Sequence, residues 1–285
     1  MYNKKVESNP SSPRISTKYK PLAIGIIASR INGLGGKIND KPRAIPFKKP
    51  GPMPDPGVVL PAVTYYYGFD ISIYPGDDEM SAFWTGTPFW YTGFYLGPVA
   101  HRNNDISWMD KRTYLKNLGY GFLVIYFGRQ QGDSGLTAAQ GRDDADDAHN
   151  LADNAGFPAG TYIFLDVEDG GTLSSQYMDY ISGWVQRIDS TSTPFWAGVY
   201  CSFYQTADQI KNALSSYALK TWCYNINVPP APGCNNIPTT APNPANCGVS
   251  FAAAWQLATN CSKTYNGTTL TIDVDTALSQ NPSVG

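Results

Sequence analysis

The feature that most constrains the fold of this chain is a repeated alternation of short apolar runs with helical patterns, which begins after residue 62. The runs are rich in aromatic and branched residues, a composition typical of buried strands. They lie at Val63–Ile71, Thr92–Leu96, Gly121–Phe127, Tyr162–Asp166, Phe195–Cys201, Lys220–Asn225, Ala252–Leu257 and Leu270–Val274. Helical patterns lie between several of them, at residues 108–118, 137–154, 174–189 and 206–216.

Strands that alternate with helices predict a parallel sheet with crossover helices, the α/β class. Eight strands in a chain of this length favour a (β/α)₈ barrel of the TIM type, which usually takes ~250 residues. An open, doubly wound sheet is the alternative, although no Gly-x-Gly-x-x-Gly motif follows the first strand. No clear helical pattern follows residue 216, and a proline-rich loop at 228–248 takes the place of a helix. We therefore expect the last quarter of the barrel to be irregular.

The first 60 residues differ in charge from the rest of the chain. Residues 1–50 hold 11 of the 21 lysines and arginines but only two of the 23 acids, and residues 41–61 hold seven prolines. This break predicts a basic, extended, proline-rich arm at 1–60 and a barrel domain at 61–285. We interpret the arm as a docking or export tag, as a tether to a protein assembly or an anionic surface, or as a disordered segment.

Two kinds of partner are not expected for this arm. No nucleic-acid-binding motif accompanies its positive charge, so we do not expect nucleic acid. Its apolar run at Leu22–Ala28 is too short to span a bilayer, so no transmembrane segment is expected. The run also makes a poor signal peptide, because it lacks a clear cleavage site.

All five cysteines lie late in the chain, at Cys201, Cys223, Cys234, Cys247 and Cys261. No Cys-x-x-Cys pair occurs and both histidines are distant in sequence, so neither a structural zinc site nor another cofactor is expected. Disulfides are favoured instead, which indicates an oxidising destination. Cys234 with Cys247 is the preferred pair, because it closes the proline-rich loop, and Cys201 is the expected free thiol. Buried, reduced cysteines are the alternative.

The helical pattern at 137–154 opens with Thr137-Ala-Ala-Gln140, the pattern of a capping box. It carries aspartates at positions 143, 144, 146 and 147, close to His149. Such a cluster suggests a metal site, but we interpret it as a solvated helix face whose charge matches the helix dipole. No metal is therefore expected.

The stretch Thr161–Gly170 places acids directly after a buried strand. Asp166 and Glu168 are two residues apart, so their side chains share one face of the strand, roughly 6.6 Å apart along it. Two carboxylates held close repel each other, and one of them tends to keep its proton. A proton donor beside a stabilising or attacking carboxylate is what cleavage of a glycosidic bond requires. The alternative is that these acids only cap the strand or bind the N-terminus of the next helix.

In a TIM-type barrel, the carboxyl ends of the strands meet at one mouth. Asp70 ends the first strand, and Asp273 and Asp275 belong to the last, so we expect them beside Asp166 and Glu168. Acids rimmed by aromatic rings are typical of sugar binding, and the chain has 19 tyrosines, 7 tryptophans and only 15% charged residues. For each aromatic residue alone, packing in the core is the alternative. The candidate substrate-binding residues at the strand ends are Tyr126, Tyr200, Trp222, Trp255, Gln256, Asp273 and Asp275.

Four strand-end motifs together resemble the plan of glycoside hydrolase family 25 lysozymes: Gly68–Asp70, Asp166–Glu168, Trp255-Gln256 and Asp273–Asp275. The longer segments Gly93–Pro98, Gly121–Gly128 and Gly156–Glu168 are similar to the glycoside-hydrolase-like barrel domains of unknown-function family 1906. The resemblance covers residues 65–280 and leaves the basic arm unexplained.

This resemblance implies a role for each acid. Glu168 is the implied proton donor, Asp166 the stabilising or assisting carboxylate, and Asp70 a support from the first strand, while Asp273 orients the sugar. Where the lysozymes have Asp-x-Asn on the last strand, this chain has Asp-x-Asp, ending in Asp275. The additional charge would raise the pKa of a neighbouring acid or attract a cation.

These features favour a glycoside hydrolase-like protein that cleaves or recognises cell-wall polysaccharide, such as peptidoglycan, in the manner of a muramidase. It would act outside the cell, at the cell envelope, or after delivery by a secretion system. One alternative is a catalytically weak or inactive glycan-binding or structural module, attached to a larger assembly through the arm. Another is a membrane-surface protein tethered by the arm.

Overall fold

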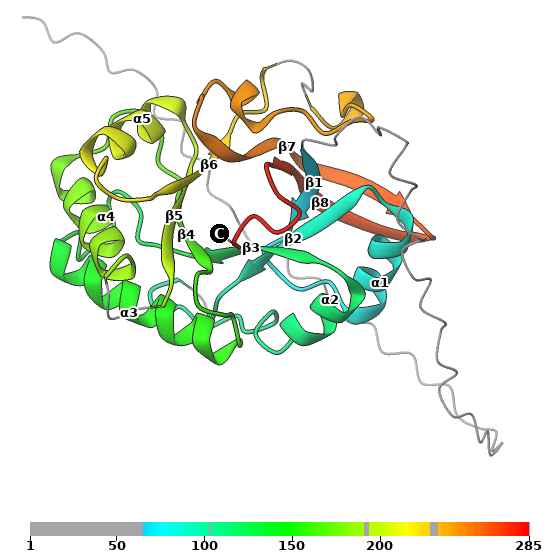
Figure 1. Ribbon diagram of the computed structural model, residues 1–285, viewed down its shortest axis with the longest axis horizontal. Coiled ribbons are helices and arrows are strands. Elements are labelled where there is room, and N and C mark those ends of the chain that lie inside the picture. Colours follow the sequence, from blue (N-terminus) through cyan, green and yellow to red (C-terminus); the bar gives the residue numbers. More distant parts are fainter. Residues whose placement is uncertain (1–64, 103, 191–193, 229–232, 285) are drawn as a thin grey trace, which may run out of the picture. The chain divides into compact units, whose positions relative to one another are not determined.

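The structure is a computed structural model that describes residues 65–102, 104–190, 194–228 and 233–284 (Figure 1). The predicted basic arm at 1–60 lies outside these residues, so the division of the chain into arm and barrel stays a prediction. Within the described residues, no helix is both long enough and apolar enough to cross a membrane.

In these residues, eight strands close into a barrel in which neighbouring strands follow chain order (Figure 1). The predicted barrel is therefore confirmed, and each predicted apolar run contributes one strand. The strands are β1 (Tyr66–Asp70), β2 (Phe89–Tyr95), β3 (Gly121–Tyr126), β4 (Tyr162–Val167), β5 (Trp196–Cys201), β6 (Lys220–Tyr224), β7 (Ala252–Tyr265) and β8 (Thr268–Ala277).

A helix follows each of the first five strands. These helices are α1 (Asp77–Gly86), α2 (Arg112–Leu118), α3 (Ala138–Asn154), α4 (Ser175–Ile188) and α5 (Tyr204–Ala213). Four of them correspond to predicted helical patterns, whereas α1 was missed. Among the described residues between β6 and β7, the helices are two short 3₁₀ turns, η1 (Cys234–Asn236) and η2 (Pro244–Cys247). The expected irregular last quarter is thus confirmed.

The last strand corrects the prediction of a wholly parallel sheet. β8 pairs antiparallel with both β7 and β1. The cause is the two-residue turn Asn266-Gly267, in which both residues have positive φ, 49° and 81°. Asn-Gly turns of this kind join antiparallel strands, whereas parallel strands need a long crossover. As a result, Asp273 of β8 lies in register with Asp70 of β1.

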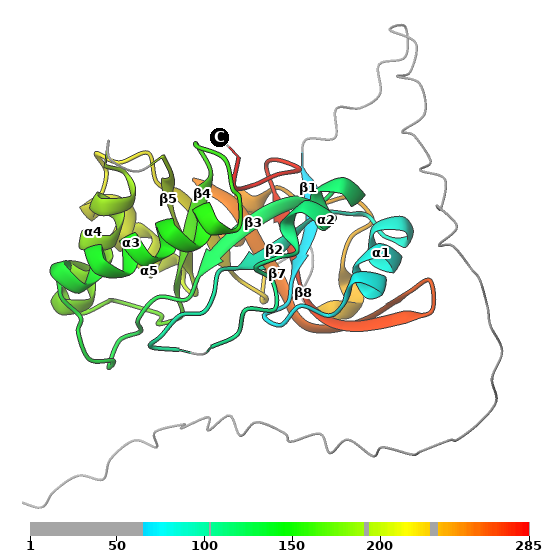
Figure 2. The same cartoon turned by 90° about the horizontal axis from the view of Figure 1, so that it is seen from below.

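The β7–β8 hairpin packs against the outside of the barrel. Its Tyr265 ring lies against Phe83 of α1 and Phe89 of β2, with ring centroids 5.3 and 6.1 Å away. Figure 2 shows α1 and the hairpin on one side of the barrel, and α3 to α5 on the other. The hairpin therefore covers part of the barrel wall that a helix covers elsewhere.

The C-terminal tail, residues 278–284, closes the end of the barrel at which β3 and β4 begin (Figure 1). The backbone amide of Phe122 donates to Oδ1 of Asn281 at 2.8 Å, and that of Val124 donates to Oγ of Ser283 at 2.8 Å. The amide of Tyr162 on β4 donates to the backbone oxygen of Ser283. The tail thus supplies acceptors for backbone amides of β3 and for that of the first residue of β4.

Side chains along the strands alternate between the barrel interior and an outer layer beneath the helices. The interior is filled largely by rings, so the barrel has a packed core rather than a pore. A Cβ atom on Gly68 would collide with the ring of Tyr91, which explains the glycine at this interior position. The interior cluster comprises Tyr91, Leu123, Ile125, Tyr162, Phe164, Tyr200, Trp222, Ala254 and Ala277.

The disulfide differs from the predicted one. Cys234 bonds to Cys261, with Cα atoms 5.3 Å apart, so the predicted pairing of Cys234 with Cys247 was wrong. β7 continues beyond the barrel into the hairpin and brings Cys261 to η1, whereas Cys247 is buried with its thiol against that of Cys223. Cys201 is a buried free thiol, as expected.

The aspartates of α3 are not the uniformly solvated face that the sequence suggested. Asp144 is buried, where Nε of Arg129 contacts its carboxylate at 2.9 Å and the hydroxyl of Tyr180 donates to it. Asp146 pairs with Nε of Arg187 at 2.6 Å. Among the described residues, no group of three or more His, Cys, Asp or Glu side chains is arranged to hold a metal ion.

Candidate active site

At the end of the barrel where β1 and β4 finish, acids from distant parts of the chain meet around Gln256 of β7. Nε2 of Gln256 donates to Oδ2 of Asp70 at 2.9 Å and lies 3.2 Å from Oδ2 of Asp273. Its Oε1 accepts a hydrogen bond from the hydroxyl of Tyr200 at 2.8 Å. Gln256 therefore fixes two carboxyl groups, and Tyr200 fixes the orientation of Gln256.

Asp70 is held from a second side by a residue that the sequence analysis missed. The hydroxyl of Tyr95, the last residue of β2, donates to Oδ1 of Asp70 at 2.6 Å. Asp70 is only 4% exposed, and burial raises its pKa, while the hydrogen bonds from Tyr95 and Gln256 partly oppose this rise. The position of Tyr95 at the end of a predicted strand is the signal that could have found it.

Asp166 and Glu168, at the end of β4, form a hydrogen-bonded pair of carboxyl groups. Burial raises the pKa of Asp166 well above its usual value, and the charge of Glu168 raises it further. Burial also raises the pKa of Glu168, while hydrogen bonds from Ser202 and from Asp166 lower it. The proton that the pair shares is therefore held mainly by Asp166, which is 5% exposed, while Glu168 is exposed.

The last strand adds two acids. Nε1 of Trp222 donates to Oδ1 of Asp275 at 3.1 Å, and Oδ2 of Asp275 is buried without a donor. Burial and the charge of Asp70 raise the pKa of Asp275 well above its usual value, and its carboxyl proton is donated to Asp70. Burial and the charge of Asp70 also raise the pKa of Asp273 to about 7, although the amide of Asn260 donates to it at 2.6 Å. The buried site therefore favours the protonated form of Asp275, which adds no charge beside Asp70.

Two loop residues support the acid pair of β4. Nε2 of Gln130 donates to the backbone oxygen of Asp166 at 2.8 Å. Its Oε1 accepts from the backbone amide of Glu168 at 2.8 Å and from the hydroxyl of Tyr177 at 2.9 Å. The positive charge of Arg102 lowers the pKa of both acids. Sequence reasoning missed Gln130 and Arg102, because both lie in loops that have no strand or helix pattern.

Residues 82–277 match the family model described as "Rv2525c-like, glycoside hydrolase-like domain". The chain belongs to this family. The predicted resemblance to glycoside hydrolase-like barrels is therefore confirmed. No curated protein matches the chain.

Solved structures share the fold of this glycoside hydrolase-like domain. One is an uncharacterized B. stearothermophilus protein, with a TM-score of 0.55 and 19% identity over 74% of this chain and 95% of the other. Another is the Tat-secreted protein Rv2525c of Mycobacterium tuberculosis, in complex with L-tartrate, with a TM-score of 0.51 and 18% identity over 76% and 97%. A third is the spore cortex lytic enzyme SleM of Clostridium perfringens, with a TM-score of 0.53 and 16% identity over 75% and 67%. At these identities the likeness establishes the fold alone.

Two of the predicted substrate-binding residues of this glycoside hydrolase-like barrel are not brought to the acids. Tyr126 points outward, and its hydroxyl donates to Asp147 of α3 at 3.0 Å. Trp255 also packs in the outer layer, and its Nε1 donates to the backbone oxygen of Asn225 at 2.8 Å. Because neighbouring residues on a strand face opposite sides, Trp255 cannot share the interior with Gln256.

Two other predicted aromatic residues lie inside the barrel but offer no open ring face. Tyr200 and Trp222 are buried, and their polar atoms are used by Gln256 and Asp275. Tyr200 therefore positions the side-chain amide of Gln256, and Trp222 positions the carboxyl group of Asp275.

Exposed rings occur instead where the loop after β5 meets the start of α5. Phe203 is 48% exposed and Tyr204 is 49% exposed, directly after Ser202, whose hydroxyl lies 3.4 Å from Oε2 of Glu168. Gly170 has no room for a side chain because Phe203 packs against it. The sequence signal for these rings is their position immediately after the fifth predicted strand.

A cavity of about 180 Å³ opens beside the acids. Asp70, Tyr95, Asn260 and Asp273 are among its lining residues, whereas Asp166 and Glu168 are not. Of the predicted catalytic acids, Asp70 is the one that borders this cavity.

Proposed function

We propose that this protein is a glycoside hydrolase that cleaves cell-wall polysaccharide, with peptidoglycan as the substrate and a muramidase-like reaction. The observation that carries the proposal is the hydrogen-bonded carboxyl pair Asp166 and Glu168, coupled to Asp70 at the end of a glycoside hydrolase-like barrel. Such a pair supplies both a proton and a negative charge, which are the two requirements of glycosidic cleavage.

The shared proton serves as the general acid. This proton first passes from Asp166 to Glu168 across their hydrogen bond, and Glu168 then delivers it to the leaving oxygen as the glycosidic C–O bond breaks. The pair is then left with two negative charges, which stabilise the positive charge that develops on the sugar ring. A water molecule adds to the anomeric carbon, and the proton that it loses restores the pair.

Substrate contacts follow from the open parts of the site. Phe203 and Tyr204 present exposed rings on which a sugar can stack, next to the exposed Glu168. Asp273 borders the cavity and can accept hydrogen bonds from sugar hydroxyls. Gln256, Tyr200, Trp222 and Asp275 then act indirectly, by holding the acids in place.

We also propose that the protein works in an oxidising, extracellular location. The Cys234–Cys261 disulfide supports this, because such bonds persist mainly outside reducing compartments. A Tat-secreted protein and a spore cortex lytic enzyme have the same fold. The basic arm at residues 1–60 would then attach the barrel to an assembly or an anionic surface.

A second candidate function is glycan binding without cleavage. It is favoured by the burial of Asp70 and Asp166 and by the small cavity, which does not reach Glu168. In that case the barrel would hold a polysaccharide chain by its exposed rings.

The test is incubation of the purified full chain with peptidoglycan, followed by measurement of reducing ends and of protein bound to the polymer. Release of reducing ends supports the hydrolase. Binding without release supports the second candidate. A protein that neither binds nor cleaves peptidoglycan, chitin or other wall polysaccharides would overturn both.

A further inference from the structure

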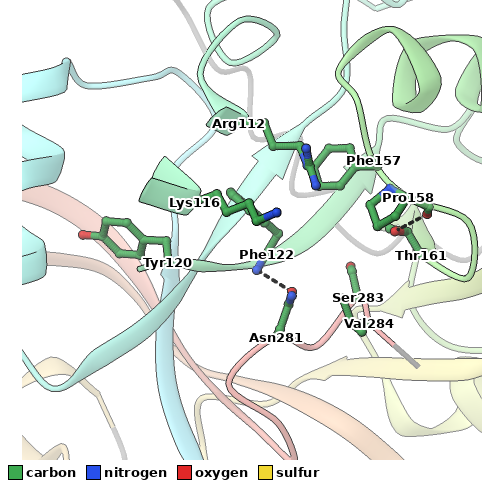
Figure 3. A pocket seen from close by; sticks show the side chains of 10 residues that line it. All are labelled: Arg112, Lys116, Tyr120, Phe122, Phe157, Pro158, Thr161, Asn281, Ser283 and Val284. Carbon is green, nitrogen blue, oxygen red and sulfur yellow. Dashed lines mark hydrogen bonds between the residues drawn. The ribbon is translucent and has the colours of Figure 1, made fainter. Parts of the chain in front are cut away.

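A second cavity, of about 240 Å³, lies at the other end of the barrel, where β3 and β4 begin (Figure 3). Its wall combines α2, the loop before β4 and the C-terminal tail. No residue of the candidate active site lines it. The cavity is therefore separate from the acids at the mouth.

Two positive side chains enter this cavity from one face of α2. Arg112 and Lys116 are four residues apart, and Figure 3 shows the ends of both side chains pointing into the same space. The guanidinium of Arg112 lies over the ring of Phe157, 4.9 Å from its centroid. This stacking fixes the direction in which the guanidinium donors point.

Neither cation has an anionic partner within the described part of the chain. The ion pairs there involve other residues, and Nε of Arg112 is buried without an acceptor. Burial lowers the pKa of Arg112, with no carboxylate to offset the effect. Buried charges in proteins are normally paired, so a partly buried arginine without an ion pair beside a cavity favours a site for an anionic ligand.

The rest of the cavity wall is largely apolar. Phe122 and Phe157 form one side, with ring centroids 5.5 Å apart. Asn281 and Ser283 of the C-terminal tail close the cavity opposite α2 (Figure 3). A concave apolar wall with two convergent charges is typical of a small-molecule site.

We propose that this cavity binds a small organic anion, a ring-sized apolar body that carries one carboxylate or phosphate group. The anionic group lies between the guanidinium of Arg112 and the amino group of Lys116, and the apolar body packs against Phe122 and Phe157. The inference is independent of the proposed function, because it depends on none of the acids at the mouth.

The test is calorimetric titration of the full chain with benzoate and with phenyl phosphate, using benzamide as the uncharged counterpart. Binding of either anion with little or no binding of benzamide supports the proposal, and the tighter anion identifies the preferred head group. Arg112→Gln and Lys116→Gln should each weaken anion binding about ten-fold, the usual effect of removing a hydrogen bond to a charged group.

Arg142→Gln is the matched control, since Arg142 is an exposed arginine of α3 away from the cavity. It should leave anion binding unchanged. Because Lys116 is exposed, its variant should fold even if Arg112→Gln does not, and thermal melts check both. The proposal is overturned if neither anion binds, if benzamide binds equally well, or if Lys116→Gln binds as tightly as Arg142→Gln.

Discussion

Gln256 and Asp70 are 186 positions apart in the sequence, yet Nε2 of Gln256 donates to the Asp70 carboxylate at 2.9 Å. The contact runs through the barrel interior, across β8, which separates their two strands. It joins the acids of the first and last strands into one electrostatic unit, in which every carboxyl group has a raised pKa. A change at one member should therefore be measurable at the others.

Tyr95→Phe should raise the pKa of Asp70. The variant keeps the ring but removes the hydroxyl that donates to Oδ1 of Asp70 and lowers its pKa. Loss of one hydrogen bond to a charged group corresponds to a shift of about one pH unit. Carbon-13 NMR titration of the Asp70 carboxyl group measures the shift directly, and an unchanged titration would show that Tyr95 does not hold this acid.

Asp273→Asn should stabilise the protein at alkaline pH but not at acidic pH. The pKa of Asp273 is raised in the folded state to about 7, so its contribution to stability is present below its ordinary pKa and is lost as the pH rises through about 7. An asparagine carries no charge and still offers an oxygen to the amide of Asn260.

The expected gain in the free energy of unfolding is about 1 to 2 kcal/mol at pH 8, where Asp273 is ionised, and near zero at pH 4. The gain at pH 8 is smaller than the full pKa shift would give, because solvent screens a partly exposed carboxylate. Urea unfolding at both pH values measures it. Asp153→Asn, an exposed site on α3, is the control and should show no such pH dependence. Equal stabilisation by Asp273→Asn at pH 4 and pH 8 would mean that charge is not the cause.

Removal of the disulfide should abolish the sensitivity of the protein to reductants. The cross-link joins cysteines 27 positions apart, and closing a loop of this length stabilises the folded state by about 3.5 kcal/mol. For the wild type and for Cys247→Ala, guanidinium unfolding should therefore give a lower free energy of unfolding with dithiothreitol than without it. The double variant Cys234→Ala/Cys261→Ala should be equally stable with and without dithiothreitol. If instead the effect of dithiothreitol disappears in Cys247→Ala, then Cys247 takes part in the disulfide.

Phe203→Ala should weaken substrate binding more than it slows bond cleavage. Its exposed ring follows Ser202, which contacts Glu168, and carries no group that could transfer a proton, so its loss should weaken stacking of the sugar more than the chemical step. We expect KM for soluble wall fragments to rise about ten-fold, with kcat changed far less. Trp196→Ala removes a similarly exposed ring at the opposite end of β5 and should leave KM unchanged. If the two variants behave alike, Phe203 is not a sugar contact.

The fold could be predicted from the sequence because the apolar runs and helical patterns repeat throughout the barrel. The direction of β8 could not be read from its own residues, which look like those of any buried strand. It is set by the turn Asn266-Gly267, a local hairpin signal that the regular alternation of strands and helices obscured. The missed helix α1 lies in the first strand–helix unit, where Met80 and Phe83 supply its buried side.

Asp70, Asp166 and Glu168 could be predicted because they lie at the ends of strands, and a barrel gathers strand ends. Asp273 and Asp275 reach the same place from within β8, which runs antiparallel. The aromatic candidates could not be predicted, because the strand period of two separates Trp255 from Gln256 and turns Tyr126 toward α3. Groups in loops, such as Gln130 and Arg102, reach the acids through tertiary contacts that no local pattern encodes. The disulfide partner of Cys234 also depended on how far β7 extends beyond the barrel.

The proposed reaction depends above all on the carboxyl pair at the end of β4. The most direct measurement is the rate of reducing-end release from peptidoglycan by the wild type, Glu168→Gln and Glu79→Gln, the last being a glutamate of α1 outside the site. We predict a loss of roughly a hundred-fold or more for Glu168→Gln, with an unchanged melting temperature, and full activity for Glu79→Gln. A Glu168→Gln protein that releases reducing ends as fast as the wild type would show that Glu168 does not supply the proton.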